Sequence, residues 1–202
     1  DNWRNAAGTL YNVDFADALS KLTTAQYRVT SQPAQAGAVI KDWTDIYSNP
    51  AGAASYTSDW AVDFAALQEW AVGYVSVRAY DMAGTTSVSA DVFHVWKDTT
   101  PPPVPGLSVP SDGALYSTST VSFSWEAVSD LKSGLAGYEL QLSTAENFST
   151  VEYSSFTADT STGVYNLPES FNYWRVRSKD NIGNYSEFSS TRSLYIDISG
   201  PS

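Results

Sequence analysis

Apolar and polar positions alternate in short runs along this chain. In the clearest run Val75, Val77 and Ala79 share one face, and a second copy places Trp174 and Val176 on the corresponding face. A period of two, rich in β-branched and aromatic residues, is typical of a strand with one buried face. Both copies end in Asp-x-x-Gly, which favours a turn. The pattern therefore predicts the same strand and hairpin twice.

Further alternating segments surround the two copies. In the first half we expect strands at 11–15, 27–30, 39–46, 60–64 and 88–97, with a loop at 17–24 that has a helical turn as its alternative. In the second half we expect strands at 107–109, 121–125, 138–142, 151–156, 164–167 and 194–198. This density of short strands predicts an all-β fold with many turns.

The two halves are related by a nearly constant offset. Tyr74, Arg78 and Asp81 each recur 99 positions later. Earlier in the chain the best matches are Phe15 with Trp125, an offset of 110 residues, and Tyr27 with Tyr138, an offset of 111 residues. The offset falls between Tyr27 and Tyr74, which predicts an insertion of about 12 residues in the first half, between the strand that contains Tyr27 and the strand that begins near Tyr74. Offsets that hold on both sides of one insertion indicate a true repeat.

A proline-rich stretch separates the halves, with the sequence Asp-Thr-Thr-Pro-Pro-Pro at 98–103. Prolines cannot donate ladder hydrogen bonds and favour an extended, semi-rigid chain. We therefore expect two domains, 1–98 and 99–202. Because only seven residues lead into the first domain before its first strand, we expect that domain to have a clipped start and the chain to belong to a longer array.

The second half carries several recognisable short motifs: Phe-Ser-Trp at 123–125, Ser-Gly-Leu-Ala-Gly-Tyr at 133–138, Tyr-Trp-Arg-Val-Arg at 173–177 and Asp-Asn-Ile-Gly-Asn at 180–184. Together with the proline stretch at 98–103, they make this half resemble a fibronectin type III module of the kind found in large secreted or surface-attached bacterial proteins. The first half matches well from 67 to 97, and a more general immunoglobulin-like variant stays open for it. The resemblance implies two tandem antiparallel β-sandwiches of about seven strands each, with two sheets in every sandwich. In such a sandwich the strand that contains Tyr27 is strand C and the strand that begins near Tyr74 is strand F, so the insertion lies between strands C and F.

The same resemblance assigns core and corner positions. It implies that Trp125 lies in the core and that Phe15 takes its place in the first half. The family's corner tyrosine falls on Gly73 and Asn172, so we expect the tyrosine corner to be absent from both halves.

Composition limits the function classes. Cysteine is absent, which excludes disulfides, thiolate metal sites and a cysteine nucleophile. A net charge of −11 opposes binding to nucleic acid, and no apolar run has the ~18 residues that membrane insertion needs. His94 is the only histidine and lacks a Gly-x-Ser-x-Gly partner, so we expect a surface histidine and no catalytic residues. We expect no cofactor and no metal; linker calcium at Asp98 is the weaker alternative.

Exposed aromatic residues are the remaining candidates for binding. Trp43, Trp70 and Trp96 fall outside the predicted core pattern, and such side chains stack on sugar rings or anchor protein partners. The competing interpretation is that Trp96 packs on the linker or a neighbouring unit and that Trp43 covers the insertion. The sequence favours non-catalytic spacer or interaction units of a secreted or cell-surface protein, acting in adhesion or display. Their partners would be neighbouring domains, a glycan or a surface protein. A carbohydrate-binding accessory module is the alternative.

Overall fold

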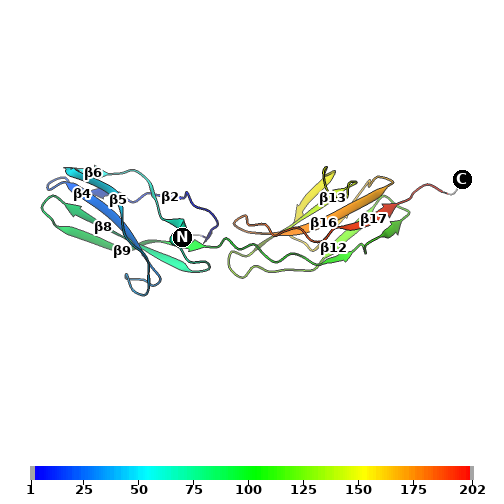
Figure 1. Ribbon diagram of the computed structural model, residues 1–202, viewed down its shortest axis with the longest axis horizontal. Coiled ribbons are helices and arrows are strands. Elements are labelled where there is room, and N and C mark those ends of the chain that lie inside the picture. Colours follow the sequence, from blue (N-terminus) through cyan, green and yellow to red (C-terminus); the bar gives the residue numbers. More distant parts are fainter. Residues whose placement is uncertain (1–2, 201–202) are drawn as a thin grey trace. The chain divides into compact units, whose positions relative to one another are not determined.

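The computed structural model describes residues 3–200 and is all-β (Figure 1). The chain divides into two compact units, Asp1–Thr99 and Thr100–Ser202. The described residues contain one 3-10 turn, η1 (Phe64–Ala66), and no α-helix. None of them forms a helix long and apolar enough to cross a membrane. The predicted fold class is confirmed.

In the first unit one sheet has five strands, in the spatial order β1-β9-β8-β4-β5. Their bounds are β1 Trp3–Arg4, β4 Leu22–Thr30, β5 Val39–Ala53, β8 Val72–Asp81 and β9 Thr86–Lys97. Two short ladders face it: β2 (Leu10–Tyr11) pairs with β7 (Trp60–Ala61), and β3 (Phe15–Ala16) pairs with β6 (Ser55–Tyr56). The buried side chains between the layers include Phe15, Tyr27, Trp60, Val75 and Val77.

In the second unit the larger sheet has the order β11-β17-β16-β13-β14, and the smaller has the order β10-β12-β15. The bounds are β10 Leu107–Val109, β11 Ala114–Tyr116, β12 Val121–Trp125, β13 Leu135–Ser143, β14 Tyr153–Thr157, β15 Ser161–Val164, β16 Phe171–Asp180 and β17 Arg192–Ile196. The core includes Phe123, Trp125, Tyr138 and Trp174. Trp125 and Phe15 are therefore core residues, as expected.

Strand pairing corrects one of the sequence matches. Tyr27 pairs with Val77, whereas Tyr138 pairs with Ser178, the residue 99 positions after Ala79. The residue of the second unit that corresponds to Tyr27 is therefore Leu140. The offset on this strand is 113, and the first unit carries 14 additional residues rather than 12. The shared tyrosine had suggested the wrong register.

The predicted loop at 17–24 is also partly wrong. β4 begins at Leu22, and no helical turn forms at 16–22. Instead, the Asp17 carboxylate accepts hydrogen bonds from the N–H groups of Leu19 and Ser20, both at 3.0 Å. This satisfies the backbone locally and brings the chain into β4 after a short turn.

The corner between β15 and β16 uses asparagine where the family uses tyrosine. Asn172 is buried, and its Nδ2 donates to the carbonyl oxygens of Pro168 at 3.1 Å and Ser170 at 3.0 Å. A buried amide that bonds two loop carbonyls fixes the entry into β16. Gly73, at the corresponding position, carries no side chain for such a bond.

Candidate interaction surfaces

The outer face of the second unit carries alternating cations and aromatic rings. The Arg175 guanidinium lies 4.0 Å from the Phe148 ring centre and 3.9 Å from that of Phe188. Arg177 follows, 4.5 Å from Phe188 and 4.1 Å from Tyr185. The series continues with the Lys179 ammonium, 4.8 Å from Tyr185 and 5.8 Å from the Phe156 ring. We call this set the ladder: Phe148, Arg175, Phe188, Arg177, Tyr185, Lys179 and Phe156.

Local sequence explains how the ladder forms. Arg175, Arg177 and Lys179 alternate on β16 and therefore share its outer face. The aromatic rings of residues 185 and 188 are brought over them by a segment bonded to the same strand. Ser186 N–H donates to the Ser178 carbonyl at 3.0 Å, and its Oγ accepts from Ser178 N–H at 3.0 Å. Ser189 makes the same pair of bonds with Val176 (2.8 and 3.1 Å).

Hydrogen bonds hold the guanidinium groups in the ladder. Nε and Nη2 of Arg177 donate to Glu139 Oε2 at 2.8 and 2.7 Å, and Arg175 Nη2 donates to Gln141 Oε1 at 2.8 Å. Burial alone would raise the pKa of Glu139, but the hydrogen bonds from Arg177 and Gln141 lower it below its usual value. Burial and the neighbouring Arg177 lower the pKa of Arg175. With their ring faces and guanidinium groups already engaged, these side chains form a structural lattice.

The first unit builds a smaller version of this surface around Trp43. Arg78 lies 4.2 Å from the Trp43 ring centre and 5.2 Å from that of Tyr80, and Arg28 lies 5.9 Å from Trp43. Arg78 Nε donates to Gln26 Oε1 at 2.7 Å. Trp43 thus lies on β5, with the Arg78 guanidinium over its ring.

Trp70 is the most exposed of the three candidate tryptophans. It is 52% exposed and has a φ of +61°, a conformation that a bulky residue rarely adopts. Its N–H donates to the Lys97 carbonyl at 2.8 Å. The neighbouring Glu69 accepts hydrogen bonds from Thr99 N–H (2.9 Å) and Thr99 Oγ1 (2.8 Å). The loop is therefore bonded to the end of β9 while the indole faces solvent.

Trp96 is half-buried and packs on another tryptophan of the same unit. Its ring centre lies 5.3 Å from that of Trp3, edge to face, and the two residues are paired across the parallel strands β1 and β9. His94 lies on the same strand and packs edge-to-face on Tyr74 at 4.8 Å. The backbone of Trp70 is thus bonded to Lys97, the residue after Trp96, whereas Trp43 lies on β5, at the opposite edge of the five-stranded sheet from β1.

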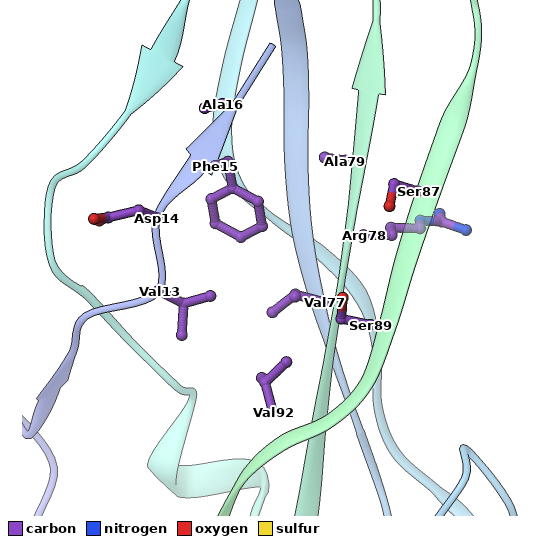
Figure 2. A pocket seen from close by; sticks show the side chains of 10 residues that line it. All are labelled: Val13, Asp14, Phe15, Ala16, Val77, Arg78, Ala79, Ser87, Ser89 and Val92. Carbon is purple, nitrogen blue, oxygen red and sulfur yellow. The ribbon is translucent and has the colours of Figure 1, made fainter.

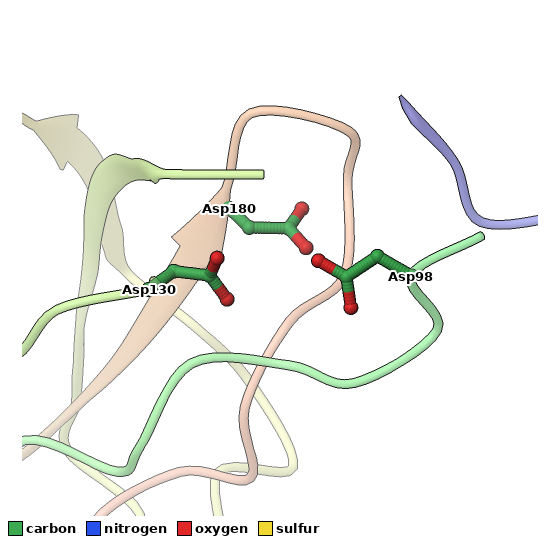
Figure 3. Close-up of side chains that lie close together, drawn as sticks. All are labelled: Asp98, Asp130 and Asp180. Atoms are coloured by element: carbon green, nitrogen blue, oxygen red, sulfur yellow. The ribbon is translucent and has the colours of Figure 1, made fainter. Parts of the chain in front are cut away.

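Carboxylates gather at one pole of each unit around a serine. In the second unit Ser133 Oγ lies 3.1 Å from Asp180 Oδ2 and 3.4 Å from Asp130 Oδ1, and both aspartates point toward the same space (Figure 3). In the first unit Ser20 Oγ lies 2.9 Å from Asp17 and 2.7 Å from Asp81. The Ser20 hydroxyl lowers the pKa of both of these carboxyls.

These aspartates also organise the turns, as the sequence predicted. Asp180 Oδ1 accepts from Ile182 N–H at 3.0 Å and Asn184 N–H at 2.7 Å, and Asp81 Oδ1 accepts from Thr85 N–H at 2.7 Å. Asp98 ends the first unit, where its N–H donates to the Arg4 carbonyl at 2.9 Å. The alternative of calcium at Asp98 stays a prediction.

Comparison with known proteins adds structural neighbours only. No protein-family model and no curated protein matches the chain. Similar solved structures include the FN1–FN3 domains of chicken CNTN1, at 19% identity over 86% of this chain and 57% of that one, with a TM-score of 0.47. The fibronectin(III)-like modules of Clostridium thermocellum CbhA are 10% identical over 96% and 87%, also with a TM-score of 0.47. The sixth fibronectin type III domain of human fibronectin type III domain containing protein 3 is 21% identical over 50% and 89%, with a TM-score of 0.35.

These values show what the chain is similar to, and with TM-scores below 0.5 they carry no argument about function. The strand orders and registers show the architecture directly. In each unit a short strand near the start, β1 or β11, pairs in parallel with the last strand, and the central hairpins are antiparallel. The chain is a tandem pair of β-sandwiches. It is similar to the fibronectin type III structures named above.

Proposed function

We propose that the chain is a non-catalytic pair of spacer or interaction units within a larger extracellular or cell-surface protein, and that it serves adhesion or display. The observation that carries this proposal is that arginine side chains on the outer face of each unit are held by other side chains of the same unit. Arg78, Arg175 and Arg177 are all bound by aromatic rings and by side-chain oxygens of their own unit. Such faces rigidify a module and leave few polar groups for chemistry.

A display experiment tests the spacer role. The chain is placed between a cell-wall anchor and a reporter domain, and binding of a large antibody to the reporter is measured on whole cells. We expect antibody binding to rise several-fold over a direct fusion without the chain. A flexible Gly/Ser linker of equal residue number serves as the control, because it spans a shorter mean distance. Antibody binding equal to that of the direct fusion would overturn the spacer role.

A second candidate function is carbohydrate binding, and the presentation of Trp70 favours it. Trp70 has an uncommon backbone conformation, and its large ring is directed to solvent. Such a ring can stack on a sugar. Titration with soluble neutral polysaccharides, followed by tryptophan fluorescence, tests this function. We expect a saturable change that Trp70→Ala abolishes, whereas Trp43→Ala and Trp96→Ala show whether the other two tryptophans contribute. An unchanged signal across a broad glycan panel would exclude it.

A further inference from the structure

A groove of about 230 Å³ opens between the two layers of the first unit (Figure 2). Val13 and Phe15 line it from one layer, and Val77 and Val92 line it from the other, with their side chains directed toward the shared space. Asp14 and Arg78 also border the groove, but their charged groups point away from it. The space is therefore an uncharged, mostly apolar slot between strands.

One wall of this groove is an unpaired strand edge. β3 pairs with β6 on one side, and none of residues 3–200 pairs with its other side. The facing strand, β9, has a bulge in which residues 90–92 lie opposite Ser76 alone, and beyond it Ser87 and Ser89 reach the groove. Backbone donors and acceptors on the free edge of β3 are available to a further strand.

The second unit shows what fills the corresponding space. There the strand that contains Trp125, which matches Phe15, pairs on that side with β10, and Leu107 lies opposite Trp125. Leu107 packs against the core. Just before it, the Pro103 carbonyl accepts a hydrogen bond from Ser178 Oγ at 2.7 Å. Ser178 corresponds to Ala79, which borders the groove of the first unit.

The second unit also indicates the size of side chain that such a space holds. Leu107 lies opposite Trp125 and packs against the core, so an occupant of the groove in the first unit would offer a leucine-class side chain.

We propose that this groove is the seat of an edge strand: an extended, uncharged segment, of the kind formed by residues 103–109, that pairs antiparallel with Phe15–Ala16 and inserts a leucine-class side chain between the layers. The source that the second unit indicates is the polypeptide itself. There the strand comes from the stretch that leads into the sandwich, so the strand that fills the first unit would enter from ahead of Asp1.

A fusion experiment tests this proposal on the two-unit chain. A second copy of residues 99–112 is joined ahead of Asp1. Five residues then separate the added valine of position 109 from Trp3, the same number that separates Val109 from Leu115. We expect the melting temperature of the first unit to rise by about 5 °C. Amide exchange at residues 13–16 should slow by about tenfold or more. The second unit serves as the internal control.

The matched control carries Leu107→Asp in the added copy only, which keeps the length and the prolines but puts a charge into an apolar slot. This variant should lose the gain in melting temperature and in protection. Equal effects of the two fusions, or no effect of either, would overturn the proposal. A free peptide of residues 103–109 forms the second arm. If it protects residues 13–16 where the fusion does not, the groove takes strands from other molecules and the intramolecular source is wrong.

Discussion

The outer faces of the two units hold equivalent arginines by different means. Arg78 and Arg177 occupy the same position on β8 and β16. Over Arg78 the ring comes from Trp43, on a strand at the edge of the sheet; over Arg177 the rings come from a segment that follows the turn. The two units therefore share the position of the arginine on the strand. They differ in the segment that provides the aromatic ring.

Phe188→Ala should have the largest effect on this comparison. It removes the ring that lies between Arg175 and Arg177, and with it two cation–π contacts and a half-buried apolar surface. We expect the second unit to lose about 3 kcal/mol of its free energy of unfolding, while the first unit is unchanged. Chemical denaturation with exchange readout for each unit measures this. Tyr165→Ala, at an exposed position outside the ladder, is the control, and a comparable loss there would refute the role of the ladder.

Trp43→Ala should cost the first unit less. Its ring stacks chiefly on one guanidinium, and Arg78 keeps its hydrogen bond to Gln26 and its contact with Tyr80. We expect a loss of about 1–2 kcal/mol, measured by the same denaturation experiment. A loss larger than that caused by Phe188→Ala would contradict this expectation. It would show that the Trp43–Arg78 contact contributes more free energy of unfolding to its unit than Phe188 of the ladder does.

Acid should distinguish the two surfaces, because the partner of Arg177 is a carboxylate and that of Arg78 is a neutral amide. Hydrogen bonds lower the folded-state pKa of Glu139, so its stabilising contribution is complete above the unfolded-state value, about 4.3, and is lost as pH falls through the folded-state pKa. We expect the protection of the amides at residues 185–189, corrected for the intrinsic pH dependence of exchange, to fall below about pH 4.

Glu139→Gln provides the matched control for that pH dependence. The variant keeps an oxygen that accepts from Arg177 but cannot titrate, so exchange at residues 185–189 should become less dependent on pH, from a lower starting stability. If the acid response of this segment is unchanged in the variant, another carboxyl is responsible.

The smallest effect is expected at Trp70. Trp70→Gly relieves the positive φ but removes the ring, and we expect it to stabilise the first unit by up to about 1 kcal/mol. Trp70→Ala removes the ring without relieving the backbone, so the difference between the two variants isolates the conformational cost. Thermal unfolding measures both. Equal stabilities would mean that the loop adopts another conformation once the indole is removed.

Periodicity revealed most of the architecture and little of the surface. Alternation placed Val75, Val77, Trp174 and Val176 in the core because a strand has only two faces. It did not reveal the ladder, since Phe188 lies in a serine-rich segment with no period of its own. The one available signal was the pair of serines three residues apart, Ser186 and Ser189, which bond the segment to β16.

The mistaken match of Tyr27 with Tyr138 has a similar cause. Residue identity favoured an offset of 111, but both strands carry a bulge just after their first residue, and the pairing that follows fixes the offset at 113. Two residues of the same type need not occupy equivalent positions. The equivalent position is set by the hydrogen bonds to the neighbouring strand. The free edge of β3 was likewise hidden, because a sequence does not show which strand edges are paired.

The parallel pairing of a strand near the start of each unit with its last strand has a mechanical consequence. In the second unit a pull on the two ends reaches β10 first, and after β10 it loads β11 and β17, whose three residue pairs lie side by side. Their hydrogen bonds are then loaded in shear and must fail together rather than one after another, as they would in a peeled hairpin. Among residues 3–200 the first unit has two such pairs, Trp3 with Trp96 and Arg4 with Lys97. A pull on the ends of either unit should therefore meet more resistance than a pull that peels a hairpin apart.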